Sequence, residues 1–192
     1  MHALNQSIDF LIPRYWQNTS KLKDSLNNII HPHIHIKKIN FVNTDFHSRF
    51  HAIKRSYRYV IINQYNPFNA NYTYYKKELN IEKVQKAIKL FEGIHNFEYF
   101  SKTGSEVNSF IREIYKTDVI SYKNYVIIKF IGNGFLRSQV RMMTQFLIDI
   151  SDEIYSIEEL NLQITKQKKV STKLISPTGL YLERVFYENF NN

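Results

Sequence analysis

The chain has 192 residues, of which 43% are hydrophobic, so it can bury a substantial core as one large domain or as two small half-domains that share an interface. It contains no cysteine, which excludes disulfides, thiolate nucleophiles and cysteine-ligated metal centres. Charged residues interrupt every apolar stretch well short of a bilayer span, and the first ten residues lack the pattern of a secretory signal. We therefore expect a cytoplasmic protein.

The charge balance points to a polyanionic partner. Lys and Arg number 26 against 17 Asp and Glu, which gives a formal net charge of +9. Such an excess favours nucleic acid as a partner. Aromatic residues make up 15% of the chain, and rings beside basic residues are suited to stacking on unpaired bases. Most rings belong in the core, but residues 46–61 interleave both kinds and form a candidate RNA contact.

The first elements predicted are a helix and a strand. Thr19 or Ser20 caps a helix whose apolar side chains recur at helical spacing until Pro32 ends it. A strand is predicted over residues 33–42.

Three histidines, His31, His33 and His35, alternate there and would share one face of a strand. Imidazoles can ligate transition metals, but a proline stands among them and no carboxylate pair is near. We interpret them as polar residues at a strand edge and expect no metal site.

A second strand is predicted over residues 55–62. Its alternation places Tyr57 on one face and Arg58 on the other. The ring of Tyr57 could stack on a base or pack across the sheet, and the pattern leaves both interpretations open.

The central elements are a helix and a hairpin. Asn80 caps a clear amphipathic helix, and Gly93 is its expected stop. Residues 111–121 and 125–131 are of strand type, so they predict an antiparallel hairpin that leads into a turn at Gly132.

Two helices and a strand complete the chain. Apolar side chains at helical spacing follow the Gly132 turn, and Ser156 with Glu159 forms a capping box for a last helix. Residues 180–187 predict a closing strand. The predicted strands form hairpins and do not alternate one by one with helices. This order indicates the α+β class with a largely antiparallel sheet.

Two arginines accompany the helix after the Gly132 turn. Arg137 and Arg141 are four residues apart, so on a helix they share a face that differs from the apolar stripe. Cations in an opening turn oppose the helix dipole, which suggests an anionic partner. The alternative is a solvated pair beside a core helix.

Three stretches carry a family resemblance. FHSRFHAIKRSYRYVI, NGFLRSQVRMM and SPTGLYLERVFY resemble, in this order, signature stretches of the tRNA pseudouridine synthase A family. GIHNFEYFSK and FIREIYKTDVI are similar to intermediate stretches of that family. Each piece alone is weak, whereas the ordered set is specific and runs along the whole chain.

The resemblance implies a pseudouridine synthase fold: a largely antiparallel mixed sheet with flanking helices, and two half-domains around a basic cleft. Here the half-domains would be residues 1–65 and 66–192. It also implies a homodimer that positions tRNA, and neither cofactor nor metal. The implied reaction isomerises uridine in the anticodon stem-loop of tRNA, which requires the nucleotide to leave the helical stack.

Site residues follow from the match of motifs. The resemblance implies that Arg141 pairs with the catalytic aspartate, that Tyr57 stacks on the uracil, and that Leu180 and Leu182 wall the site. Arg137 stands where the family commonly has a ring. Phosphate contacts are expected at the remaining basic positions of the motifs, Arg49, Arg55, Arg58, Lys102 and Arg137.

The start of the chain departs from the family pattern. MHALNQSIDF resembles the residues that directly follow the family's GRTD motif, so the catalytic aspartate is expected upstream of Met1. No aspartate of this sequence lies in a matching motif. We therefore expect the chain as it stands to be inactive. The alternatives are a tRNA-binding module without chemistry, or a fragment that folds poorly because a sheet edge is exposed.

Overall fold

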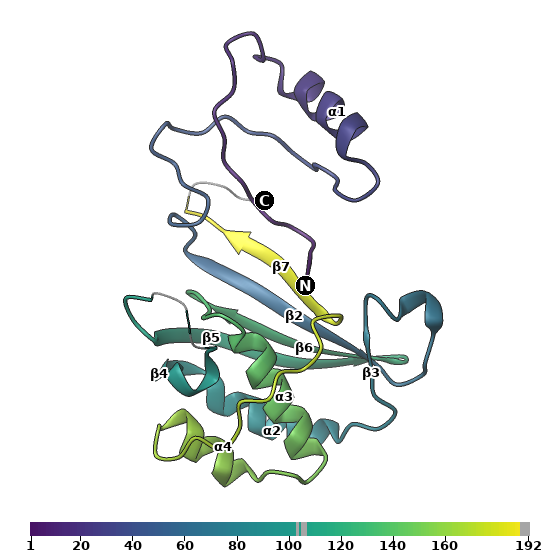
Figure 1. The fold of residues 1–192 in the computed structure, drawn as a ribbon, viewed down its shortest axis with the longest axis vertical. Helices are drawn as coiled ribbons and strands as arrows, with labels where there is room; N and C mark the ends of the chain where they lie inside the picture. The colour runs from purple at the N-terminus through teal and green to yellow at the C-terminus, as the bar shows by residue number, and fades with distance from the viewer. Residues whose placement is uncertain (103, 105–106, 189–192) are drawn as a thin grey trace. The chain divides into compact units, whose positions relative to one another are not determined.

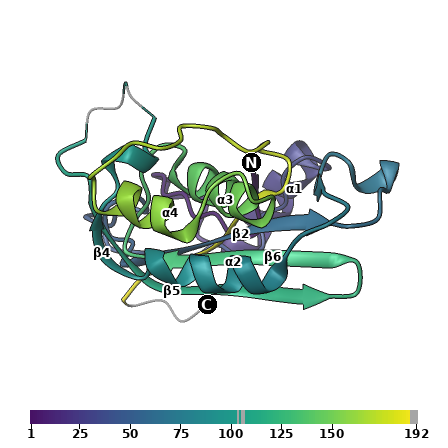
Figure 2. The same cartoon turned by 90° about the horizontal axis from the view of Figure 1, so that it is seen from below.

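The computed structural model describes residues 1–102, 104 and 107–188. Its strands form a single mixed sheet, and the helices that follow residue 80 lie on one face of that sheet (Figures 1 and 2). The strands are β1 (His2–Ala3), β2 (Lys54–Ile62), β3 (Tyr74–Tyr75), β4 (Gly93–Asn96), β5 (Ile111–Tyr122), β6 (Tyr125–Gly132) and β7 (Leu180–Phe186). The helices are α1 (Thr19–Ile30), α2 (Ile81–Ile88), α3 (Gln139–Ser151) and α4 (Ile157–Ile164).

The sheet has the order β1-β7-β2-β6-β5-β4, with β3 paired to β2. Only β1 with β7 and β2 with β3 are parallel among the described strand pairs, so the predicted α+β class with a largely antiparallel sheet is confirmed. The hairpin prediction is confirmed too, since β5 and β6 pair up to Tyr122 and Tyr125. Among the described residues, no helix is long and apolar enough to cross a membrane.

The chain forms two compact units. One unit comprises Met1–Gln6 and Ala52–Asn192, and it contains the whole sheet with α2, α3 and α4. The other unit is Ser7–His51, which contains α1. The half-domain boundary at residue 65 stays a prediction from the sequence.

In the smaller unit, the helix prediction is confirmed and the strand prediction is wrong. The side chain of Asn18, one residue earlier than expected, caps α1 by accepting from the backbone N–H of Lys21. Residues 33–42 form no strand. The Asn27 side chain, nine positions earlier in the chain, instead accepts from the N–H of Ile36 at 2.7 Å and donates to its carbonyl at 3.1 Å. These bonds replace the pairing that a ladder would give, so the three histidines do not share a strand face.

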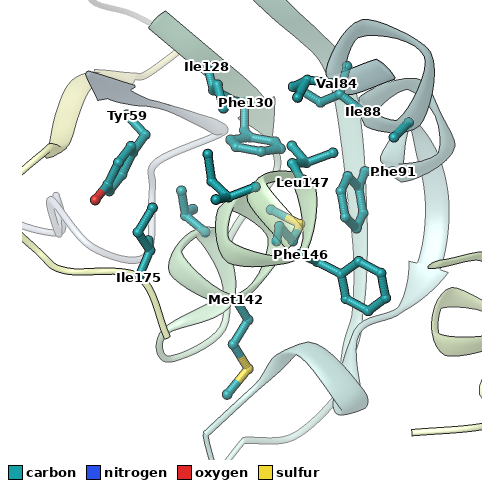
Figure 3. Packing of buried hydrophobic residues seen from close by; sticks show 14 of the residues in the cluster. Tyr59, Val84, Ile88, Phe91, Ile128, Phe130, Met142, Phe146, Leu147 and Ile175 are labelled. Atoms are coloured by element: carbon teal, nitrogen blue, oxygen red, sulfur yellow. The ribbon is translucent and has the colours of Figure 1, made fainter. Parts of the chain in front are cut away.

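The core of the larger unit lies between the sheet and the helices, and Figure 3 shows part of it. Alternation along β2 holds as predicted, since Tyr59 and Ile61 are at most 1% exposed and face the helices. Buried aromatic side chains account for much of the packing, which orders the sheet rigidly against α2 and α3. The rings and aliphatic groups that meet there include Tyr59, Val84, Ile88, Phe91, Ile128, Phe130, Phe146 and Leu147.

Candidate active site

Tyr57 lies in the middle of the sheet, on the face that the helices cover. It is paired with Leu182 of β7 on one side and Phe130 of β6 on the other. The ring of Phe135, from the turn after β6, stands edge-on to Tyr57 with centroids 5.1 Å apart. Burial raises the pKa of the Tyr57 phenol, and the charge of Arg55 opposes this only in part. Tyr57 is therefore a neutral ring with a second ring packed against it in a T-shaped contact.

Arg141 lies in the first turn of α3, and the backbone before β7 fixes its position. Its Nε donates to the carbonyl of Ile175 at 2.7 Å. The next carbonyl, that of Ser176, accepts from the hydroxyl of Tyr59 at 2.7 Å. Tyr59 and Arg141 thus hold consecutive peptide groups of one segment, which leads directly into Leu180 and Leu182.

Among the described residues, no carboxylate forms an ion pair with Arg141. With Nε engaged by a carbonyl, the terminal nitrogens keep the fork geometry that binds a carboxylate or phosphate in bidentate fashion. The terminal nitrogens of Arg141 can therefore bind an anion on the face of β2 that carries Tyr59.

The prediction that Arg137 shares a helix face with Arg141 is wrong. Helix α3 starts at Gln139 because Ser138 adopts a left-handed backbone with φ of 65°. The buried Gln139 side chain accepts from the N–H of Leu136 at 2.7 Å, which closes this turn. Arg137 therefore precedes the helix, exposed, and its carbonyl accepts from the N–H of Lys102 at 3.1 Å.

A second pair of arginines surrounds the turn between β6 and α3. Arg55 Nη1 donates to the carbonyl of Asn133 at 3.4 Å, a long hydrogen bond. Arg112 donates to the carbonyl of Ser109 at 2.8 Å, and its Nε lies 3.6 Å from where a Cβ on Gly134 would stand. Burial lowers the pKa of Arg112, and the side chain stays a cation at physiological pH. The turn that presents Phe135 is thus lined by two positive charges.

Arg58 lies on the other face of β2 from Tyr57. Its guanidinium lies 5.5 Å from the centre of the Tyr181 ring, and its buried Nε has no hydrogen-bond partner among the described atoms. On the same face, Glu183 forms an ion pair with Lys129 at 2.8 Å and accepts from the Ser56 hydroxyl. Arg58 is therefore packed against the sheet, away from Tyr57, and its role as a phosphate contact stays a prediction.

Glu183 gives the sheet a pH-dependent contribution to stability. Burial raises its pKa, but the hydrogen bonds from Lys129 and Ser56 and the charges of Lys129 and Arg58 outweigh this, so its pKa lies below the ordinary value of 4.5. A depressed carboxyl pKa adds stability above pH 4.5 that is lost as the pH falls through the folded-state pKa.

We therefore expect Glu183→Gln to be less stable than the wild type at pH 7, with the difference shrinking below pH 4.5. Urea denaturation of both proteins at pH 7, 5 and 3.5 checks this. A pH-independent difference would show that Glu183 acts through packing and not through its charge. Glu188→Gln is the matched control, because Glu188 is exposed and no ion pair is recorded for it among the described residues.

Of the remaining predicted site residues, Leu182 lies directly beside Tyr57 and Leu180 beside Tyr59, whereas the basic residues lie elsewhere. Lys102 and Arg137 are joined through their backbones, and the guanidinium of Arg137 lies beside Gly104. Leu180 pairs with Tyr59 and Leu182 with Tyr57, both nearly buried. Arg49 belongs to the smaller unit, where its guanidinium lies 5.7 Å from the centre of the Phe50 ring.

Four features of the site escape sequence reasoning. They are Phe135 against Tyr57, Arg112 beside Gly134, the hydroxyl of Tyr59, and the close approach of Gly179 to β2. Phe135 stands inside the NGFLR stretch and Gly179 inside GLYL, so their motifs were visible. The contacts of these residues could not be predicted from the sequence, because each partner comes from a distant part of the chain.

Comparison with known proteins finds relatives along most of the chain. Residues 87–188 match the family described as tRNA pseudouridine synthase. The tRNA pseudouridine synthase A of Campylobacter jejuni (strain RM1221) is 35% identical over 174 residues, which cover 90% of this chain and 72% of that protein. That of Limosilactobacillus reuteri (strain DSM 20016) is 37% identical over 195 residues, covering 97% and 75%. That of Helicobacter hepaticus (strain ATCC 51449 / 3B1) is 38% identical over 192 residues, covering 97% and 77%.

The resemblance stated from the motifs is thereby confirmed, and the mixed sheet with flanking helices agrees with the pseudouridine synthase fold. Three separate relatives match most of the chain at 35–38% identity. The chain belongs to the tRNA pseudouridine synthase family.

Proposed function

We propose that this chain acts in the reaction of a tRNA pseudouridine synthase, an isomerase that converts uridine to pseudouridine in the anticodon stem-loop. The observation that carries the proposal is Arg141, whose Nε is held by the Ile175 carbonyl while no described carboxylate pairs with it. A guanidinium fixed in this way suits a carboxylate nucleophile that must stay ionised.

The isomerisation breaks the glycosidic bond between C1′ and N1 of uracil and forms a bond from C1′ to C5, after which the C5 proton moves to nitrogen. Tyr57 would stack on the base while it turns, with Phe135 packed against the tyrosine ring. Because burial raises the pKa of the phenol, Tyr57 is protonated at physiological pH and can donate a hydrogen bond. Leu180 and Leu182 would supply the apolar side of the site.

We expect the 192-residue chain to bind tRNA and to form no pseudouridine, because none of its aspartates lies in a matching motif. The measurement is fluorescence anisotropy with an unmodified tRNA transcript at several salt concentrations. Pseudouridine is then detected by primer extension after carbodiimide treatment. Pseudouridine above background would show that the chain has its own nucleophile, and a failure to bind tRNA at low salt would contradict the tRNA function.

A non-catalytic tRNA-binding protein is the second candidate, favoured by the net charge of +9 together with the Arg141 that no described carboxylate pairs. Salt-dependent binding distinguishes it from a poorly folded fragment, which would aggregate with concentration. We also propose a cytoplasmic homodimer, as in the family. Sedimentation equilibrium of the chain with and without tRNA tests the dimer.

A further inference from the structure

A basic loop, residues 165–175, follows α4, and its lysines take no part in the site described above. It carries Lys166, Lys168, Lys169 and Lys173, and between Glu159 and Glu183 the sequence has no acidic residue. Lys168, Lys169 and Lys173 are exposed. We name this segment the lysine loop.

Buried Gln163 fixes the backbone of the lysine loop. Its side-chain oxygen accepts from the N–H groups of Val170 and Ser171, each at 2.8 Å. Its side-chain nitrogen donates to the carbonyl of Ser171 at 3.0 Å and to that of Tyr99 at 3.2 Å. Gln163 is fully buried, so these bonds are shielded from water. The loop is thus held in one conformation, which lowers the entropy lost when it binds a partner.

A tyrosine organises the lysine side chains. The amines of Lys166 and Lys169 lie 5.6 and 5.7 Å from the centre of the Tyr99 ring. Glu98, next to Tyr99, forms an ion pair with Lys166. The charge of Lys166 is therefore neutralised by Glu98. Among the described residues, Lys168, Lys169 and Lys173 form no ion pair.

The lysine loop is continuous with the candidate active site. Lys173 stands two residues before Ile175, whose carbonyl holds Arg141. Tyr99 stands three residues before Lys102, whose N–H binds the carbonyl of Arg137. The lysine loop is thus linked to Arg141 through Ile175, and Tyr99 is linked to Arg137 through Lys102. All of these residues belong to the larger unit.

We propose that the lysine loop, through Lys168, Lys169 and Lys173, is a second RNA contact that binds backbone phosphates of the same tRNA away from the nucleotide at Arg141. The inference rests on the proposed function. Exposed lysines on a rigid backbone suit phosphates, which they bind as point charges with no base specificity. The loop would therefore add affinity without selecting the uridine.

The test compares the wild type with the triple variant Lys168→Ala, Lys169→Ala, Lys173→Ala for binding of a tRNA transcript by fluorescence anisotropy. We expect the affinity at low salt to fall about 10-fold, and the slope of log affinity against log salt to become shallower by roughly 2 to 3. All three side chains are exposed, and Lys169 and Lys173 contact the rings of Tyr99 and Tyr155, so the thermal transition should shift only slightly.

The control is the triple variant Lys77→Ala, Lys86→Ala, Lys116→Ala, which removes the same charge from exposed positions elsewhere on the larger unit. We expect it to lose much less affinity. Equal losses in both variants would show an effect of net charge alone and overturn the proposal, as would an unchanged affinity and slope in the lysine-loop variant. If the wild type itself fails to bind tRNA, the proposed function is contradicted. That result is distinguishable from the two outcomes that overturn only the role of the lysine loop.

Discussion

Replacing Gly179 with alanine is expected to lower the free energy of unfolding by about 3 kcal/mol, the upper part of the usual range for overpacking a well-packed site. A Cβ at this position would stand 2.6 Å from the carbonyl oxygen of Val60 and 2.9 Å from the Tyr59 ring. Neither neighbour can yield, because Tyr59 is fully buried and the Val60 N–H donates to the Gly179 carbonyl at 2.8 Å. The segment before β7 would have to move away from β2.

This displacement reaches the site, since the same segment holds Arg141 through the Ile175 carbonyl. We therefore expect Gly179→Ala to weaken tRNA binding as well as stability. Gly134→Ala is the matched control, because its Cβ would meet its nearest neighbour, Arg112, at an ordinary 3.6 Å. That variant should be as stable as the wild type or about 0.5 kcal/mol more stable. Urea denaturation measures both, and equal stability of Gly179→Ala and Gly134→Ala would contradict the close approach.

The elements that the sequence predicts well are those with local causes. Asn80 accepts from the N–H of Lys83 and Ser156 forms its full capping box, so both helix starts lie where the sequence puts them. The hairpin of β5 and β6 follows from two β-type runs around a short polar tip. In each case the residues that make the structure are within a few positions of one another.

The elements that the sequence predicts wrongly depend on side chains acting at a distance or against propensity. Residues 33–42 have an alternating pattern, yet Asn27 captures the peptide of Ile36 from nine positions away. The start of α3 is set by Ser138 in a left-handed conformation that few non-glycine residues adopt. This separates Arg137 from Arg141, so helical spacing alone misplaced one of the two arginines. The motif match implies Arg141 as a site residue, and that role stays a prediction, whereas its contact with Ile175 required the tertiary structure.

The second large effect is expected at Tyr57. Tyr57→Ala should weaken binding of an unmodified anticodon stem-loop by about 5- to 150-fold, because stacking of a base on an aromatic ring contributes roughly 1–3 kcal/mol. Tyr57→Phe keeps the ring and should bind nearly as well as the wild type. The phenol is neutral in both the free protein and the complex at physiological pH, since burial raises its pKa. The hydroxyl thus contributes one hydrogen bond at most, and the ring contributes the stacking.

Two measurements separate stacking from folding, because Tyr57→Ala also removes a ring that packs edge-on against Phe135. Thermal denaturation of each variant shows the fraction that is folded, and anisotropy titrations are carried out well below the lower transition. Tyr122→Ala is the control, since Tyr122 is 63% exposed at the end of β5 and no site contact depends on it. A folded Tyr57→Ala protein that binds the stem-loop as tightly as Tyr122→Ala would show that Tyr57 is a packing residue of the sheet. An affinity loss confined to Tyr57→Ala and restored by Tyr57→Phe would assign the base contact to its ring.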